Sequence, residues 1–173
     1  DSGIPTAWVS RMRESMAQLT LRFSASRAVS EYTEKHYLPA AAAYHARRAN
    51  ESAIGRRLVD WEHALARKWD GLAFGEMKLE TQGEQHVFEV WLRLNDIDPS
   101  TVRVELYADG VMDNGPVRQE MKRVHPLADA RGGYVYKAAV SAFRPPEDYT
   151  ARVIPHCDGV AIPLENARIL WQR

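Results

Sequence analysis

The sequence lacks most features of membrane, secreted and nucleic-acid-binding proteins. It holds a single cysteine, Cys157, so no disulfide can form within the chain, which is compatible with a reducing, cytoplasmic location. The 23 Lys and Arg equal the 23 Asp and Glu, which removes the electrostatic case for nucleic acid or an anionic membrane as a partner. No apolar run approaches the ~18 residues of a membrane span, and no secretory signal heads the chain.

The common catalytic motifs are missing as well. No glycine-rich phosphate loop, GxSxG elbow or HExxH zinc motif occurs, and no cysteine accompanies a histidine at zinc spacing. His156 precedes Cys157, but neighbouring strand residues point to opposite faces, which places the two side chains poorly for sharing a proton. We therefore expect no catalytic residue, no metal site and no cofactor-binding residue in this chain.

The charged clusters of the sequence are typical of turns and of exposed helix surfaces. Asp96–Asp98 and Asp109–Asp113 form neither a glycosidase pair nor a calcium loop, so we interpret them as turn residues. Basic pairs at 47–48, 56–57 and 67–68 are interspersed with acids. They indicate a solvated helix face with i,i+4 ion pairs rather than a nucleic-acid surface.

What the chain does contain is enough apolar material for a packed core. Hydrophobic residues make up 45% of the 173, including five tryptophans. The chain begins with Asp1 rather than Met, as expected of a processed chain or of a piece of a longer one.

The first 71 residues have helical periodicity. A first helix begins near Pro5, and Ser24 or Ser26 is expected to cap a second, which Pro39 should end. A long third helix follows and stops at Asp70–Gly71. Its second half carries an apolar stripe that consists of Ile54, Leu58, Trp61, Leu65 and Trp69. These patterns predict terminal helices over 1–38 and a connecting helix over 39–71.

The remaining residues, 72–173, alternate with a period of two. Strands are predicted around Phe88–Leu94, Val102–Leu106, Tyr134–Val140, Tyr149–Val153 and Ala167–Trp171. About seven short strands separated by Gly, Pro, Asn and Asp turns are typical of an antiparallel sandwich of immunoglobulin-like type. The predicted fold class is α+β, with N-terminal helices followed by this sandwich.

One aromatic side chain needs its own interpretation. Trp91 alternates with Phe88, Val90 and Leu92 and so falls on the other face of its strand. An outward tryptophan can stack on a glucan, or it can lie where the sandwich meets the helices. We favour the second role, with Trp61 and Trp69 of the helical stripe on the opposite side of that contact.

The segment from Trp8 to Tyr32 is the most specific in the chain. It resembles the end of the catalytic body of α-glucan phosphorylases, where a tryptophan opens a helix, a basic residue precedes Phe-Ser, and an arginine and Glu-Tyr follow. The matching positions are Trp8, Arg22, Phe23, Ser24, Arg27, Glu31 and Tyr32. Ser26 stands where animal enzymes usually carry aspartate, so the chain looks like the bacterial branch. Residues 33–40, 88–107 and 149–156 resemble that branch too.

The resemblance implies a parent glycosyltransferase that uses pyridoxal phosphate to cleave α-1,4-glucan with phosphate, giving glucose 1-phosphate. The family's cofactor lysine lies in a glycine-rich stretch upstream of the Trp8 region, and no such stretch occurs here. The chain is thus expected to be a non-catalytic C-terminal piece whose partner is the remainder of the catalytic body. α-Glucan contact and a homo-oligomer are left open.

Two alternatives remain: a free-standing carbohydrate-binding module and a protein-interaction domain. The first helices carry a large apolar face, which is relevant to these alternatives. It is formed by Trp8, Met12, Met16, Leu19 and Phe23. A chain of 173 residues offers little to cover it. We therefore expect part of 1–38 to be loosely packed or buried in a neighbouring molecule.

Overall fold

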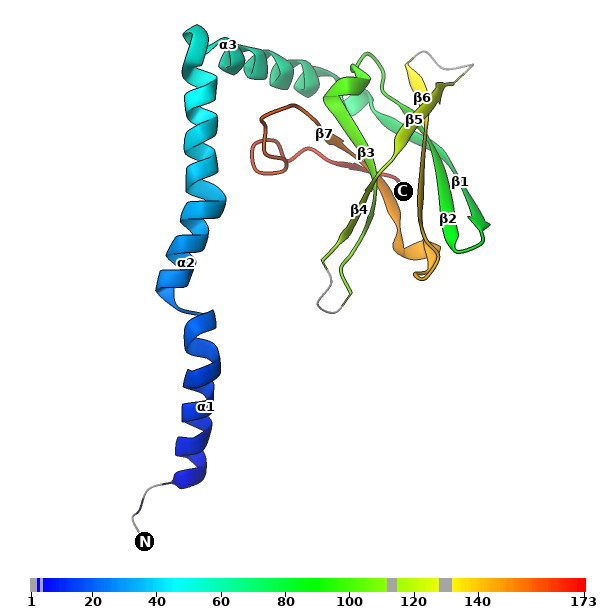
Figure 1. Cartoon of the computed structure of the whole chain (residues 1–173). Coiled ribbons are helices and arrows are strands. Elements are labelled where there is room, and N and C mark those ends of the chain that lie inside the picture. The colour runs from blue at the N-terminus through cyan, green and yellow to red at the C-terminus, as the bar shows by residue number, and fades with distance from the viewer. Residues whose placement is uncertain (1–2, 4, 112–114, 128–131) are drawn as a thin grey trace. The chain divides into compact units, whose positions relative to one another are not determined.

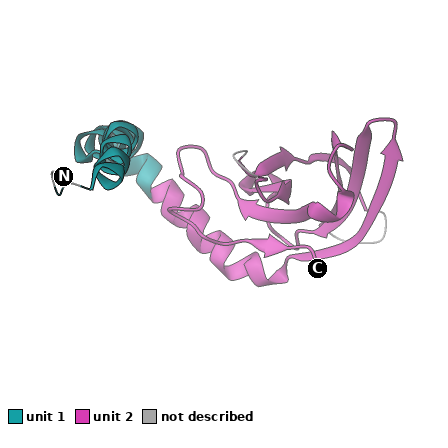
Figure 2. Ribbon diagram, turned by 90° about the horizontal axis from the view of Figure 1, so that it is seen from below, with its two compact units in different colours: residues 1–55 teal, residues 56–173 magenta. Residues whose placement is uncertain are grey.

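The structure is a computed structural model that describes residues 3, 5–111, 115–127 and 132–173. The chain divides into two compact units, residues 1–55 and 56–173 (Figure 2). Asp113, the last residue of the predicted Asp109–Asp113 turn cluster, lies outside the described residues. No helix of the described chain is both long and apolar enough to cross a bilayer.

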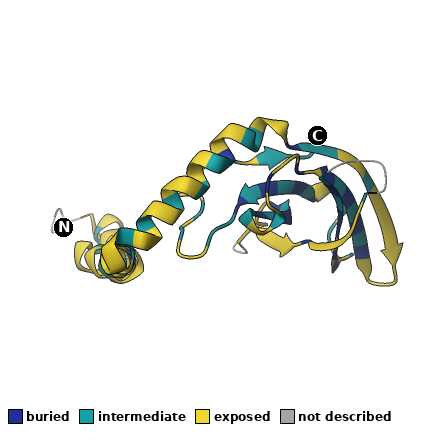
Figure 3. Cartoon of the chain, turned by 90° about the horizontal axis from the view of Figure 1, so that it is seen from above, coloured by how far each residue is buried: buried dark blue, intermediate teal, exposed yellow. Residues whose placement is uncertain are grey.

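The first unit is entirely helical. It contains α1 (Thr6–Arg22), α2 (Ala25–Tyr32), the π-helical turn η1 (Thr33–Tyr37) and the beginning of α3 (Leu38–Lys68) (Figure 1). None of its described residues is buried, as the absence of dark blue from these helices in Figure 3 shows. The described part of residues 1–38 is therefore exposed, and whether it is loosely packed or covered by a neighbouring molecule stays a prediction.

Pro39 does not end a helix, contrary to the sequence prediction. Leu38 has helical φ and ψ of −65° and −46°, and its N–H donates to the Thr33 carbonyl. A proline inside an α-helix removes one hydrogen bond and clashes with the carbonyl four residues earlier. The wider π-helical turn over 33–37 shifts the bonding by one residue directly before Pro39, so the helix continues through it.

The third helix is not continuous, which is a second correction. Ala49 is extended, and Asn50, Glu51 and Ser52 have positive φ of 50–60°. Asparagine tolerates the left-handed region, and Asn and Ser are poor helix formers because their side chains compete for backbone hydrogen bonds. The apolar stripe begins only at Ile54, after this segment, so it carries no information about the break.

The second unit packs two antiparallel sheets face to face. Sheet 1 has the order β1 (Ala73–Gln82), β2 (Gln85–Arg93), β6 (Gly133–Ser141), β5 (Lys122–Pro126), and sheet 2 has β4 (Val117–Glu120), β3 (Val102–Ala108), β7 (Thr150–Pro155), β8 (Leu170–Trp171) (Figure 1). Short 3₁₀ turns occupy Trp69–Gly71, Pro99–Thr101 and Pro146–Asp148. The predicted α+β class is confirmed.

The core lies between the sheets, where the predicted alternation places it. Phe88, Val90 and Leu92 of β2 face Leu106 of β3 and Val153 of β7 in one buried cluster. The part of α3 in this unit buries Leu65 in the same cluster, so the last turns of the helix belong to the sandwich fold.

Three strands were not predicted, and one was misplaced. β1 carries a bulge between Phe74 and Met77 that changes its phase, while β4 and β5 are exposed and polar. β8 covers only Leu170–Trp171, and it is Leu170 that packs on the core, not Ile169. Apolar residues on both faces of 167–171 made its register ambiguous.

Candidate functional site

The motif residues lie on α1, α2 and the turn between them. Ser24 is the N-cap of α2, and its Oγ accepts a hydrogen bond of 3.2 Å from the Arg27 backbone N–H. Of the two capping serines considered, it is therefore Ser24 that serves, because a hydroxyl at this position satisfies a free helical N–H. The turn places Phe23 between the two helices, with the Arg22 guanidinium 5.7 Å from its ring centre.

Two more motif residues form an ion pair along α2. Arg27 donates to Glu31, and Lys35 lies 3.5 Å from the other Glu31 oxygen. The Arg27 hydrogen bond and charge lower the pKa of Glu31. These contacts, at i,i+4 spacing, support the helix rather than form a reaction centre.

The aromatic motif residues face solvent within this chain. Trp8 is 61% exposed and Phe23 67% exposed, and Tyr32 is also exposed. Met12, Met16 and Leu19 follow Trp8 at helical spacing and are exposed too. The helices of the first unit thus leave a row of their own large apolar side chains exposed.

Trp61 and Trp69 occupy the second unit. Both are half-buried and pack against the core of the sandwich. The Trp61 Nε1 atom is enclosed and has no hydrogen-bond partner among the described residues. Trp91 lies elsewhere, over β1, where it neighbours Gly75 and has the Lys78 ammonium 5.3 Å above its ring.

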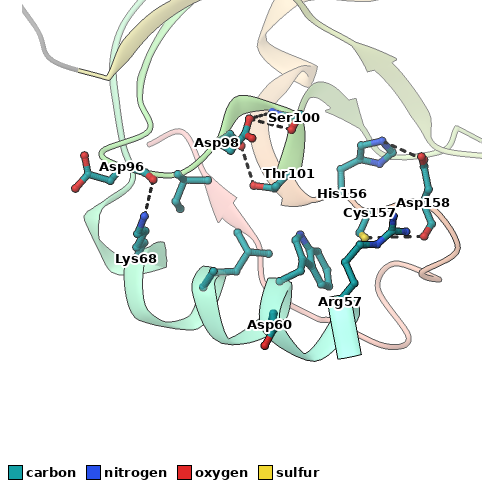
Figure 4. Close-up of a pocket in the computed structure, with 14 residues that line it drawn as sticks. Arg57, Asp60, Lys68, Asp96, Asp98, Ser100, Thr101, His156, Cys157 and Asp158 are labelled. Carbon is teal, nitrogen blue, oxygen red and sulfur yellow. Dashed lines mark hydrogen bonds and ion pairs between the residues drawn. The ribbon is translucent and has the colours of Figure 1, made fainter. Parts of the chain in front are cut away.

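A cavity of about 660 Å³ lies beside Trp61 (Figure 4). Its walls come from α3, from the loop between β2 and β3, and from the segment after β7. The charged lining residues are Arg57, Asp60, Lys68, Asp96, Asp98 and Asp158. Sequence reasoning singled out Trp61 and the Asp96–Asp98 cluster separately, and the fold brings them together.

The loop wall is held rigidly. The Asp98 carboxylate accepts hydrogen bonds of 2.9 Å from both the backbone N–H and the hydroxyl of Ser100, and these lower the pKa of Asp98. Lys68 Nζ donates to the Asp96 carbonyl at 2.8 Å, which ties the end of α3 to the loop. Gly132 is required nearby, because a Cβ there would come within 2.3 Å of the Asn95 carbonyl oxygen.

His156 and Cys157 line the same cavity without contacting each other through their reactive atoms. His156 Nδ1 is 3.1 Å from Arg103 Nη2 and Nε2 is 4.0 Å from Asp158, while the Cys157 thiol is directed to the Asp158 carbonyl. Because an arginine side chain only donates, Nδ1 is the acceptor in this contact. This geometry provides no base for the thiol.

The described residues contain no cluster of three or more His, Cys, Asp or Glu that could hold a metal. All five lysines of the chain lie among the described residues. Lys35 pairs with Glu31, Lys78 lies over Trp91, and Lys68 already donates to a carbonyl. Lys122 and Lys137 are exposed partners across neighbouring strands. The cavity beside Trp61 is lined by charged and hydroxyl side chains and by apolar ones, among them Trp61, Leu65 and Ile97.

Comparison with known proteins gives a consistent result. No family model matches the chain. It is 28% identical to a maltodextrin phosphorylase of Thermococcus litoralis over 95% of its own length, and 26% and 25% identical to glycogen phosphorylases of Mycobacterium bovis and Mycobacterium tuberculosis over 90%. The resemblance predicted from the Trp8–Tyr32 segment is thereby confirmed.

The match covers only part of those relatives. The chain spans 20% of the Thermococcus protein and 19% of each mycobacterial protein, about a fifth of the length in every case. The homology therefore relates this chain to one region of α-glucan phosphorylases.

Proposed function

We propose that this chain is a non-catalytic, C-terminal part of an α-glucan phosphorylase, with its first helices completing the catalytic body. The observation that carries the proposal is the uncovered apolar row of the first unit. Burying one such side chain stabilises a protein by about 1.5–3 kcal/mol, and helices this short depend on tertiary packing for their stability. The rest of a five-fold longer protein would supply that packing.

Catalysis would then reside outside this chain. The parent would phosphorolyse α-1,4-glucan to glucose 1-phosphate in the cytoplasm, with pyridoxal phosphate supplying the phosphate group that takes part in the reaction. The contribution of this chain's own residues would then be structural. Trp8, Phe23 and Tyr32 would bury their rings in the body, and Ser24 and Arg27 would fix the turn that presents them.

The sandwich is proposed to be immunoglobulin-like. With the eight strands lettered A, B, C, C′, D, E, F and G in chain order, sheet 1 reads A-B-E-D and sheet 2 reads C′-C-F-G. This order supports the assignment, because immunoglobulin domains place ABED in one sheet and CFG in the other. The inter-sheet disulfide of antibody domains has no counterpart in a chain with one cysteine.

A second role, glucan contact, is favoured by the cavity beside Trp61. An indole wall flanked by acidic and basic side chains suits a sugar, whose apolar faces stack and whose hydroxyls donate and accept. Titration of maltoheptaose into the folded chain tests this role. We expect Trp61→Ala to abolish binding and Trp91→Ala to preserve it, and the reverse result would move the contact to β1.

The mass of the native protein tests the main proposal. An antibody raised against this chain should detect a band about five times 19.6 kDa in the source cells, since the chain spans about a fifth of its relatives. The purified full-length protein should then release glucose 1-phosphate from maltooligosaccharide and phosphate. A native band at 19.6 kDa would refute the proposal and favour a free-standing binding module.

A further inference from the structure

A second cavity, of about 640 Å³, lies on the outer face of sheet 2. Residues 103 and 105 of β3 point to this face because they alternate with the buried Val102, Val104 and Leu106. Cross-strand pairing places Arg152 of β7 beside Glu105. The segment 156–169, after β7, forms the remaining wall and contributes Arg168.

Positive charge dominates this cavity. Four arginines line it, namely Arg103, Arg118, Arg152 and Arg168, against the carboxylates of Glu105 and Asp158. Glu105 is committed to Arg152, with Arg152 Nε and Nη2 at 2.7 and 2.5 Å from the same oxygen. Asp158 is almost fully exposed, so water screens its charge.

The other three guanidinium groups have unused donors. Arg103 Nη2 contacts the His156 ring, and Arg103 Nε is enclosed without a hydrogen bond although the Glu120 carboxylate lies 3.4 Å away. Among the described residues, the Arg168 guanidinium donates only to the Asn166 side chain, at 3.3 Å. The Arg118 guanidinium has no hydrogen bond or ion pair to any residue in the described parts of the chain.

The fourth arginine gives the cavity a fixed wall. The Arg152 guanidinium lies 4.2 Å from the Tyr107 ring centre and 5.1 Å from that of Trp171. In contact with both rings and paired with Glu105, it needs no additional counter-ion. An anion entering the cavity would therefore meet Arg103, Arg118 and Arg168, whose mutual repulsion it would relieve.

We propose that this cavity binds a phosphate group, either free or as a phosphate monoester, through Arg103, Arg118 and Arg168. Planar guanidinium groups present paired N–H donors that match phosphate oxygens, and such charge-assisted bonds are roughly twice as strong as neutral ones. The volume lies within the 300–1,000 Å³ of small-molecule sites, which leaves room for an esterified group. The inference does not rest on the proposed function.

Calorimetric titration of the 173-residue chain with inorganic phosphate tests the site, with sodium chloride at matched ionic strength as the reference. Arg118→Gln and Arg168→Gln should each weaken phosphate binding at least about tenfold, the loss of roughly 1.4 kcal/mol. Arg93→Gln is the matched control, because Arg93 is exposed on β2 and lies outside the cavity. It should bind phosphate with the affinity of the unsubstituted chain. Equal affinity in all three variants, or equal heat with chloride, would overturn the proposal.

A variant that is expected to bind phosphate more tightly separates an effect on the site from a loss of binding caused by misfolding. Glu120 competes for Arg103, so Glu120→Gln should strengthen phosphate binding several-fold, which a folding defect cannot imitate. Glucose 1-phosphate in place of phosphate separates the two sources: tighter binding indicates a monoester, and equal binding indicates the free ion. Unchanged or weaker binding by Glu120→Gln would contradict the assigned role of Arg103.

Discussion

The stability of the sandwich depends most clearly on one charged pair, Glu105 with Arg152. Their side chains are 6% and 12% exposed, and two aromatic rings enclose the guanidinium. A buried ion pair contributes little compared with an apolar replacement. Removing one partner, in contrast, leaves an uncompensated charge and is strongly destabilising.

Glu105→Ala should therefore lower the free energy of unfolding of the sandwich by roughly 3–5 kcal/mol. Glu120→Ala is the matched control, because Glu120 pairs opposite Glu105 across β3 and β4 but is 66% exposed, and it should cost less than about 1 kcal/mol. Urea unfolding followed by tryptophan fluorescence measures both. Similar losses would show that the Glu105–Arg152 pair is effectively solvated.

Tyr136 makes the stability of the sandwich depend on pH in the alkaline range. Burial raises its pKa from 10.0 to about 12. The unfolded chain thus loses the phenolic proton first, and the contribution of Tyr136, complete below pH 10, declines as the pH rises from 10 to 12. Between pH 10 and 12 the Tm of the unsubstituted chain should fall relative to the Tm of Tyr136→Phe. A constant difference would refute the raised pKa.

At the scale of elements, α1 provides a direct test of whether its apolar row is an interface. Trp8→Ala should change the stability of the 173-residue chain by less than about 0.5 kcal/mol, since Trp8 is 61% exposed. In the full-length protein the same change should cost about 3–5 kcal/mol, the usual loss for a buried tryptophan.

Leu21→Ala is the matched control for that experiment. Leu21 is 81% exposed and, at 100° per residue, falls on the opposite side of α1 from Trp8. It should have little effect in either protein. If Trp8→Ala and Leu21→Ala behave alike in the full-length protein, the row of apolar side chains is not buried there.

Elements with strong periodicity were predictable from the sequence, and elements at edges were not. β2, β3, β6 and β7 alternate cleanly because one face of each enters the core. β4 and β5 bury almost nothing and are fixed by hydrogen bonds to their neighbours, which leave no pattern in side chains. The passage through Pro39 and the break at 49–52 depend on local backbone geometry that apolar spacing does not report.

The same limit applies to the candidate sites. Trp61 and the Asp96–Asp98 cluster could be named from the sequence, but their meeting in one cavity depends on the fold. The arginine cavity gave no signal as a motif, because Arg103, Arg118, Arg152 and Arg168 come from three strands and a loop. Outward-facing Arg and Glu at alternate positions of β3 were the only local indication.

At the scale of the whole molecule, the two units differ in self-sufficiency. The core of the second unit, with the side chains packed against it, is drawn from residues 61–170, all within 56–173, whereas no described residue of the first unit is buried. A unit with its own core can be removed from a larger protein without exposing new apolar surface elsewhere, provided that its interface is small. A unit without its own core depends for its stability on packing against another surface.

Truncations of the full-length protein should therefore behave asymmetrically. Deleting residues 56–173 should leave a soluble enzyme that still releases glucose 1-phosphate, because the catalytic body keeps its covering helices. Deleting everything from residue 6 onward should uncover the surface that these helices occupy, and the product should aggregate or lose activity. Size-exclusion chromatography and a phosphorolysis assay distinguish the two. An active, monomeric protein lacking α1 and α2 would show that the apolar row serves another partner, and insolubility of both truncations would show that the sandwich is equally integral to the fold.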